Sequence, residues 1–127
     1  MIQEHFRKFD SKNLAALIED YKQDGPKIAW KGQTLLIPGN YDGTEALRIL
    51  FGMLYNEVDL LKTEIRWYSA TIDSNSANIQ MEICFTGNQR STALDFAATI
   101  DTKAIVVFDD GKWKIGEESW NFRVLSK

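Results

Sequence analysis

Apolar residues recur at helical spacing over the first part of the chain, from Ile2 to Tyr21. The spacing slips once, at Asp10-Ser11-Lys12-Asn13, where Asp, Ser and Asn side chains can cap a helix N-terminus. The pattern therefore predicts two helices, or one bent helix with a new start near Ser11 to Asn13. Gly25-Pro26 ends this helical region.

Two short apolar runs follow, at 28–30 and 34–37, with Lys31-Gly32-Gln33 between them. They predict a small strand pair or a bulged strand. The composition of 39–43 is typical of a turn.

A third helix is predicted after Thr44, which can serve as its N-cap. One apolar stripe of this helix includes Leu47, Leu50, Phe51, Leu54 and Val58. Since Ile49 and Met53 form a second stripe, we expect the helix to be covered on two sides.

The rest of the chain changes to a β pattern rich in β-branched and aromatic residues. Turn-forming stretches separate four predicted strands, at 63–72, 78–86, 96–108 and 113–125. Strands this long rise about 3.3 Å per residue and must twist and curl. The predicted fold class is therefore α+β: a strongly curved antiparallel sheet wrapped around the N-terminal helices and the third helix.

The last strand changes its phase part-way along. Trp113 and Ile115 have odd numbers, whereas Trp120, Phe122 and Val124 have even ones. Strict alternation would put the two groups on opposite faces. A β-bulge at Gly116 would bring all five side chains to one interior, because an isolated glycine in a strand often accommodates a bulge.

The composition narrows the class of protein. The chain has 127 residues, which fits a single domain over 1–127, and it carries a formal net charge of −3 and one cysteine. Cys84 alone cannot form an intramolecular disulfide. The N-terminal residues lack a secretory pattern and no stretch is long and apolar enough for a membrane span, so we expect a cytoplasmic protein without a membrane partner. Because basic residues are scattered, no nucleic-acid partner is expected, and no motif calls for a metal or cofactor.

Three motifs carry a family resemblance. They are the helical segment from Asn13 to Tyr21 with Asp24 after it, the segment Pro38-Gly39 through Gly43-Thr44-Glu45-Ala46-Leu47-Arg48-Ile49-Leu50-Phe51, and the hairpin Phe108-Asp109-Asp110-Gly111-Lys112-Trp113-Lys114-Ile115. Their order and spacing resemble the nuclear transport factor 2 (NTF2)-like superfamily, in particular its SnoaL-like and ketosteroid-isomerase-like branch. The likeness implies an α+β cone with a deep apolar pocket and, commonly, dimers formed through the outer face of the sheet. It does not imply one activity, because members include isomerases, cyclases, dehydratases and interaction modules.

The resemblance argues against steroid-isomerase chemistry in this chain. Ungapped counting places Trp30 where those enzymes have their catalytic carboxylate, and Ala104 near the position of their oxyanion acid. Their N-terminal-helix tyrosine maps near His5, which would have to act without these two partners.

Three residues are candidate acids or bases. His5 is the only histidine and could exchange protons near neutral pH, or it could be a partly exposed residue of the first helix. Asp101 could be an acid within an apolar run, or it could face solvent by alternation. Glu118 points inward if the bulge falls at Gly116, and burial would then raise its pKa; otherwise Glu117 takes that place.

Alternation also divides the segment 79–86. Ile79, Met81, Ile83 and Phe85 should line the pocket, whereas Gln80, Glu82, Cys84 and Thr86 face a partner or solvent. Arg66 and Arg90 could each clamp an acidic ligand, or could simply be solvated.

Aromatic side chains are the strongest candidates for a ligand site. By resemblance, Trp30, Tyr55, Trp67 and Trp120 surround the cavity, together with Met81, Ile83 and Phe85, although aromatic rings also serve as core filler. We therefore predict a protein that binds a small apolar or aromatic molecule without a recognisable catalytic set, and that forms a homodimer. The alternatives are a SnoaL-like isomerase, cyclase or dehydratase with an acid–base residue in the pocket, and a non-enzymatic dimerisation or protein-interaction module.

Overall fold

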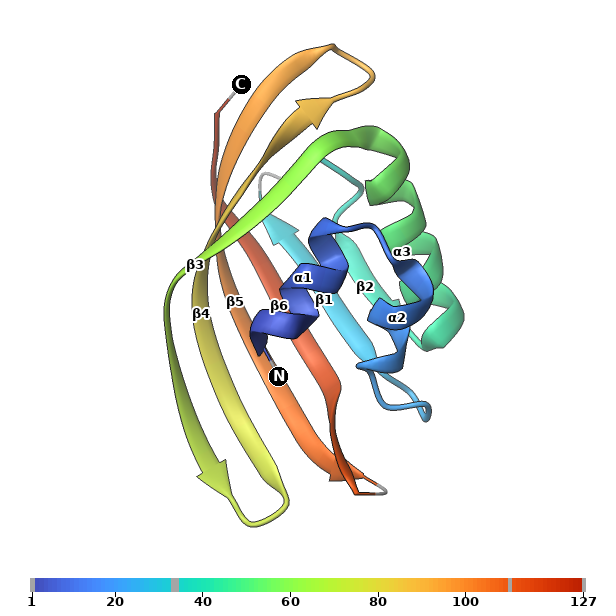
Figure 1. Cartoon of the computed structure of the whole chain (residues 1–127), viewed down its shortest axis with the longest axis vertical. Coiled ribbons are helices and arrows are strands. Elements are labelled where there is room, and N and C mark those ends of the chain that lie inside the picture. The colour runs from blue at the N-terminus through green and yellow to red at the C-terminus, as the bar shows by residue number, and fades with distance from the viewer. Residues whose placement is uncertain (1, 33–34, 110, 127) are drawn as a thin grey trace.

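Three helices lie against the concave face of a long, curved sheet in the computed structural model, which describes residues 2–32, 35–109 and 111–126 (Figure 1). In chain order the elements are α1 (Ile2–Asp10), α2 (Leu14–Glu19), β1 (Lys27–Gly32), β2 (Gly39–Asp42), α3 (Thr44–Glu57), β3 (Val58–Asp73), β4 (Ser76–Gln89), β5 (Leu94–Asp109) and β6 (Lys112–Ser126). The predicted α+β class and curved sheet are confirmed.

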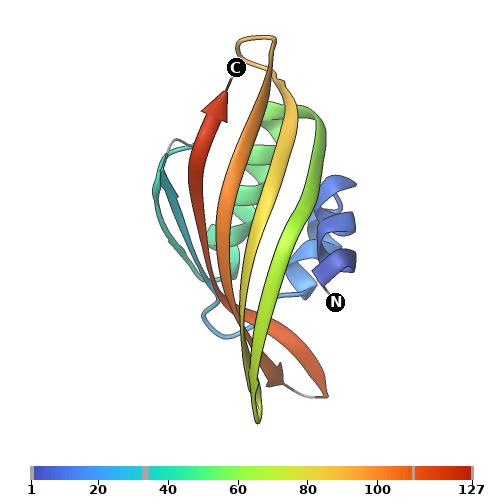
Figure 2. The ribbon, with the colours of Figure 1, turned by 90° about the vertical axis from the view of Figure 1, so that its left-hand side faces the viewer.

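The six strands form one sheet in the order β2-β1-β6-β5-β4-β3. The long strands β3 to β6 pair antiparallel through hairpins, while β1 pairs parallel with β6 and antiparallel with β2. Viewed from the side, the long strands twist and bend around the helices (Figure 2). This curvature gives the molecule a concave face toward the helices and an outer face away from them.

The N-terminal region forms two helices, as the slip in spacing predicts. Asn13 is the N-cap of α2, and its side chain accepts a hydrogen bond from the Ala16 N–H. Lys12 turns the chain between the helices with a φ of 60°, and its ammonium donates to the carbonyls of Tyr55 and Val58 at the end of α3. The end of α3 is thereby fixed to the turn between α1 and α2.

Two expectations for the third helix are wrong. Its N-cap is Gly43, not Thr44, and no side chain caps it. Ile49 and Met53 are exposed, so α3 is covered on one side only, the side that carries the buried residues Leu47 and Leu50. A second apolar stripe on a helix thus did not indicate a second covering layer.

The small strand pair also differs from the prediction. β2 lies at Gly39–Asp42, within the stretch expected to be a turn, whereas 35–38 contains no strand and Thr34 is outside the described residues. β2 forms by backbone pairing with β1, from Lys27 opposite Asp42 to Trp30 opposite Gly39. Since its side chains are mostly exposed, hydrophobic alternation could not have located it.

The bulge in β6 falls at Gly116, as predicted. Val106 pairs with Ile115, but the preceding residue Ile105 pairs with Glu117, so Gly116 has no partner in the ladder. Trp113 and Ile115 therefore share the inner face with Glu118, Trp120 and Phe122. The side chain of Val124 is outside the described ones.

Candidate functional site

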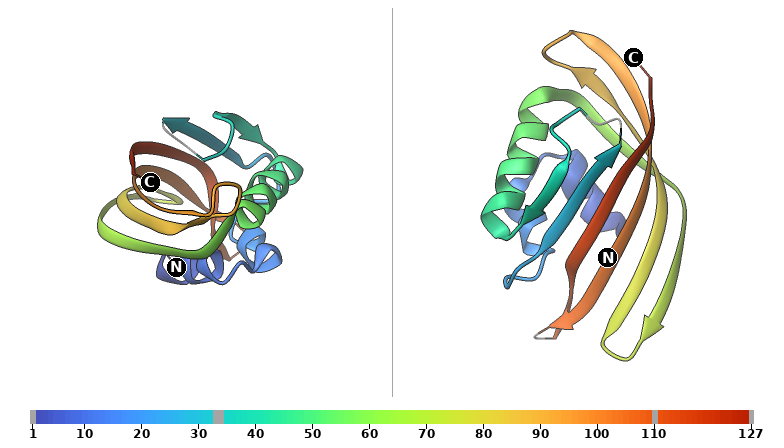
Figure 3. Two further views of the ribbon diagram at one scale, coloured as in Figure 1. Left: turned by 90° about the horizontal axis from the view of Figure 1, so that it is seen from above. Right: turned by 180° about the vertical axis from the view of Figure 1, so that it is seen from behind.

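The concave face has two parts that differ in packing. We call the part beneath the helices the covered end; it includes Trp30, Phe85, Trp120 and Phe122. Beyond the N-terminus of α1 the strands continue without a helix over them, and we call this part the open end (Figures 1 and 3).

Aromatic rings fill the covered end. Trp30 and Trp120 are fully buried and stack with their centroids 5.1 Å apart, and Phe122 lies 5.0 Å from Trp30. Five of the predicted ligand contacts lie in this core: Trp30, Met81, Ile83, Phe85 and Trp120. A ligand could reach them only by displacing packed side chains.

The other two predicted ligand contacts lie at different places. The ring of Tyr55 packs 5.7 Å from Phe9, and its buried hydroxyl has no hydrogen-bond partner in the described part of the chain. Trp67 is half exposed on the edge strand β3. It pairs with Glu82, so its side chain belongs to the outer face of the sheet. It nevertheless borders the open end.

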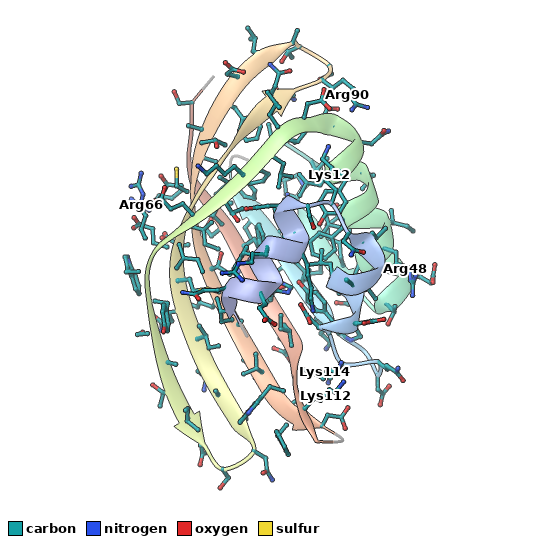
Figure 4. All side chains as sticks on the ribbon, in the orientation of Figure 1. Lys12, Arg48, Arg66, Arg90, Lys112 and Lys114 are labelled. Carbon is teal, nitrogen blue, oxygen red and sulfur yellow. The ribbon has the colours of Figure 1, made fainter. Side chains whose placement is uncertain are left out.

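A hollow of about 700 Å³ occupies the open end. The inner-face side chains that line it, together with the first residues of α1, are uncharged: Ile2, Gln3, Ile65, Tyr68, Ala70, Ile72, Ala77, Ile79, Val106 and Trp113. Tyr68 and Ile72 are 61% and 72% exposed, which is unusual for large apolar side chains on the inner face. Arg66 also borders the hollow, but its side chain points away from the helices (Figure 4) and lies 3.7 Å from Glu82.

Phe108 lies outside the core, although its position on β5 places it on the inner face. It is half exposed at the far end of β5, where its ring meets Trp113 edge-on at 5.4 Å. None of the helices in the described part of the chain extends over this pair, so the alternation that places Phe108 on the inner face does not bury it.

A polar cluster lies between α1 and the end of α2. The ring of His5 is only 1% exposed, and its Nδ1 lies 2.8 Å from Oδ2 of Asp20. Lys8 donates to the other carboxylate oxygen of Asp20, also at 2.8 Å. Burial raises the pKa of Asp20, but the hydrogen bonds from His5 and Lys8 outweigh this effect and hold the pKa below its ordinary value. The alternative of a partly exposed His5 is therefore wrong.

A second buried pair lies beside His5. The hydroxyl of Tyr21 donates to Glu118, and the Tyr21 ring lies 5.6 Å from the His5 ring. Burial raises the pKa of Glu118, although His5 and the hydrogen bond from Tyr21 oppose the effect. Burial and the nearby Glu118 raise the pKa of Tyr21 well above its ordinary value.

The polar cluster adjoins the inner end of the hollow. His5 lies one helical turn from Ile2, which lines the hollow. Glu118 pairs across the sheet with Ala104, the next inward residue after Val106. Nε2 of His5 is buried and has no hydrogen-bond partner among the described residues. The arrangement places one oriented imidazole and one buried carboxyl next to the residues that line the hollow, although neither group lines it.

Other candidate residues lie outside the cluster. Asp101 is on the outer face, where Arg123 donates to it at 3.1 Å, so it is not an interior acid. Glu117 faces outward, as the bulge requires. Arg90 forms a close pair with Asp59 and is not a free clamp.

Sequence reasoning missed Asp20 and Tyr21. Both were considered only as parts of a helical motif, because polar spacing alone does not reveal that the segment after α2 turns to meet α1. An isolated bridge between Tyr21 and Ile115 holds this segment against β6.

In the ranges that the structure describes, His, Cys, Asp and Glu side chains form no group of three or more suited to a metal ion, and no helix is long and apolar enough to cross a membrane.

Comparisons with known proteins identify the architecture. No protein-family model matches the sequence, and no curated protein matches it significantly. An NTF2-like protein of unknown function from Pseudomonas putida KT2440 superposes with a TM-score of 0.76 at 12% identity, covering 94% of this chain and 80% of that one. The chain has the NTF2-like fold.

Other solved structures share this NTF2-like fold. A type 2 hexachlorocyclohexane dehydrochlorinase has a TM-score of 0.82 at 14% identity, covering 98% of this chain and 82% of that one. A ketosteroid isomerase-like protein from Erwinia carotovora atroseptica SCRI1043 has a TM-score of 0.75 at 14% identity, covering 94% and 88%. The predicted resemblance is thus confirmed at the level of fold.

Proposed function

We propose that this protein binds a small, uncharged apolar or aromatic molecule in the hollow at the open end. The supporting observation is the hollow itself, about 700 Å³ in volume and lined on its inner face by exposed apolar side chains. This volume is within the range of small-molecule sites, and the absence of inward charges among the described lining residues favours an uncharged ligand.

Titration with 1-acetonaphthone, a neutral aromatic ketone, tests the proposal through tryptophan fluorescence. Trp113 and Trp67 border the hollow, so we expect saturable quenching. Ile72→Asp should abolish saturation, because it places a carboxylate against the bound ring. Ile37→Asp is the matched control, since Ile37 is equally exposed but does not line the hollow. Quenching that is linear in wild type, or unchanged in Ile72→Asp, would reject the proposal.

A second candidate function is acid–base catalysis on the bound molecule. It is favoured by His5, whose Nδ1 is held by Asp20 while Nε2 is buried and unpartnered among the described residues. In this candidate, Nε2 of His5 accepts or returns a carbon-bound proton, Asp20 orients the ring, and Glu118 supplies a second proton site. A solved structure of the same fold is described as a dehydrochlorinase, which shows that the fold can host an enzyme.

Hydrogen–deuterium exchange at the acidic carbon of 2-tetralone, followed by NMR, separates catalysis from binding. If the protein is an acid–base catalyst, exchange should be faster than in buffer. This acceleration should be lost in His5→Gln and retained in Asp101→Asn. If 2-tetralone binds saturably but exchanges only at the buffer rate, catalysis is rejected and the binding function remains.

The homodimer through the outer face stays a prediction. Light scattering across the micromolar range tests it, and a monomer throughout would contradict it.

A further inference from the structure

The strand β3 forms one edge of the sheet, and its two halves differ in what lies beside them. In the described part of the chain β3 pairs only with β4, so one side of its backbone faces no other strand. At the covered end α1 reaches this edge, where the carboxylate of Asp10 accepts hydrogen bonds from the backbone N–H and the hydroxyl of Thr63. Beyond α1, every residue from Arg66 to Asp73 is exposed (Figures 1 and 2). We call the segment 66–73 the open edge.

The open edge lacks the features that normally protect an edge strand. Such strands are very short, or carry a charge, a proline or a bulge where another strand could pair. β2, at the opposite edge of the sheet, is only four residues long. In β3 the bulge lies before Trp67, and the stretch 67–72 contains no charged residue and no proline. Since Trp67, Tyr68 and Ile72 are all exposed, this stretch is suited to pairing with a further strand.

The charges of the open edge indicate which strand that is. Its only charged residues are Arg66 at the start and Asp73 at the end. When a segment pairs antiparallel with a second copy of itself about a two-fold axis, the start of each copy lies beside the end of the other. Arg66 of each copy then approaches Asp73 of the other, so two ion pairs form by symmetry. Parallel pairing in register would instead bring like charges together.

One register satisfies these charges. With Ala70 opposite itself, Asp73 lies opposite Trp67 of the second copy and next to its bulged residue Arg66. By alternation Asp73 and Trp67 share the outer face, and the side chain of Arg66 also points to that side (Figure 4). A shift of two residues in either direction would move Asp73 beyond Arg66 or back to Ser69. The two-fold axis therefore belongs at Ala70.

We propose that two copies of this protein pair antiparallel along their open edges, with the two-fold axis at Ala70. The sheet then continues from one copy into the other, and both concave faces lie on the same side. Tyr68 and Ile72, which line the apolar hollow, lie opposite each other across the axis on the inner face. Each copy thereby adds apolar side chains to the rim of its neighbour's hollow. This interface is distinct from dimerisation through the outer face, which edge pairing leaves uncovered.

Cysteine cross-linking tests the position of the axis, with Ala70→Cys placed in a Cys84→Ser background that removes the natural thiol. Residues directly opposite on antiparallel strands have Cβ atoms about 4.5–5.5 Å apart, which is close enough for a disulfide after a small adjustment. We expect copper phenanthroline to convert most of this variant into a covalent dimer. Ser69→Cys in the same background is the matched control, because residue 69 lies opposite Thr71 and is too far from its own copy to be bridged.

Sedimentation velocity across the micromolar range measures the same contact without a cross-link. Asp73→Lys should weaken the dimer about tenfold, because both symmetric ion pairs become repulsive. Asp109→Lys makes the same change of charge at an exposed position of β5, which is an interior strand of the sheet. This control should leave the dimer unchanged.

Three results would overturn the proposal. They are a monomer throughout the micromolar range, cross-linking of Ser69→Cys equal to that of Ala70→Cys, and a dimer that Asp73→Lys leaves intact. A dimer of the last kind would use another surface, such as the outer face. Edge pairing does not rest on the proposed ligand, so its failure leaves the 1-acetonaphthone result untouched.

Discussion

The covered and open ends of the concave face are built from the same strands but differ in what lies over them. At the covered end, Trp30 and Trp120 are fully buried under the helices. At the open end, Tyr68 and Ile72 point to the same side of the sheet and are mostly exposed. Alternation along a strand therefore decides which face a side chain occupies, while helix length decides whether that position becomes core or site.

Trp120→Ala should be the most destabilising change. It removes a fully buried indole that contacts Trp30, Phe6 and Phe9, so we expect a loss of about 3–5 kcal/mol. Trp113→Ala should cost much less, because Trp113 is only partly buried at the open end. Urea denaturation measures the free energy of unfolding of both variants. If both lose the same amount, the two ends do not differ in packing as described.

Asp20→Asn tests the polar cluster at the boundary between the ends. We expect a loss of about 2 kcal/mol at neutral pH, because a carboxylate that accepts hydrogen bonds from His5 and from the ammonium of Lys8 is replaced by a neutral amide. Since folding lowers the pKa of Asp20, its contribution is present above the ordinary value of 3.8 and is lost as pH falls through the folded value. The difference between wild type and variant should therefore shrink in acid, and a constant difference would contradict the assignment.

Glu118→Gln should have a smaller effect with the opposite dependence on pH. Folding raises the pKa of Glu118, so the folded state binds more protons, and the free energy of unfolding falls as pH rises from the ordinary value of 4.5 through the folded value. The free energy of unfolding of Glu118→Gln should not show this decrease as pH rises. Denaturation curves between pH 4 and pH 9 test it, and parallel profiles would show that the carboxyl is not buried as described.

Ile72→Ser at the open end should change the free energy of unfolding by no more than about 0.5 kcal/mol, because the side chain is mostly exposed. Its effect should fall on ligand affinity instead. A loss of stability comparable to that of Trp120→Ala would show that the open end is core.

The sequence predicts the secondary structure of this fold better than its site. The long strands, the Asn13 cap and the Gly116 bulge each depend on local chemistry, and the structure confirms them. β2 was missed because backbone pairing forms it. The solvent exposure of Phe108 could not be predicted, because no local pattern shows where a helix stops covering a sheet.

The candidate site depended on contacts distant in sequence. His5 and Glu118 were identified as single candidates, but their partners Asp20 and Tyr21 become visible only when α1, the end of α2 and β6 meet. The hollow has the same origin, because it exists where α1 begins and the strands continue past it.

The four tryptophans allow the most direct test of the central claim, that ligands enter the open end and not the aromatic core. The indole N–H signals in ¹⁵N-correlated NMR, assigned with single Trp→Phe variants, can be followed during titration with 1-acetonaphthone. We predict that the signals of Trp113 and Trp67 shift saturably while those of Trp30 and Trp120 do not. Shifts of Trp30 and Trp120 without a change at Trp113 would contradict the account.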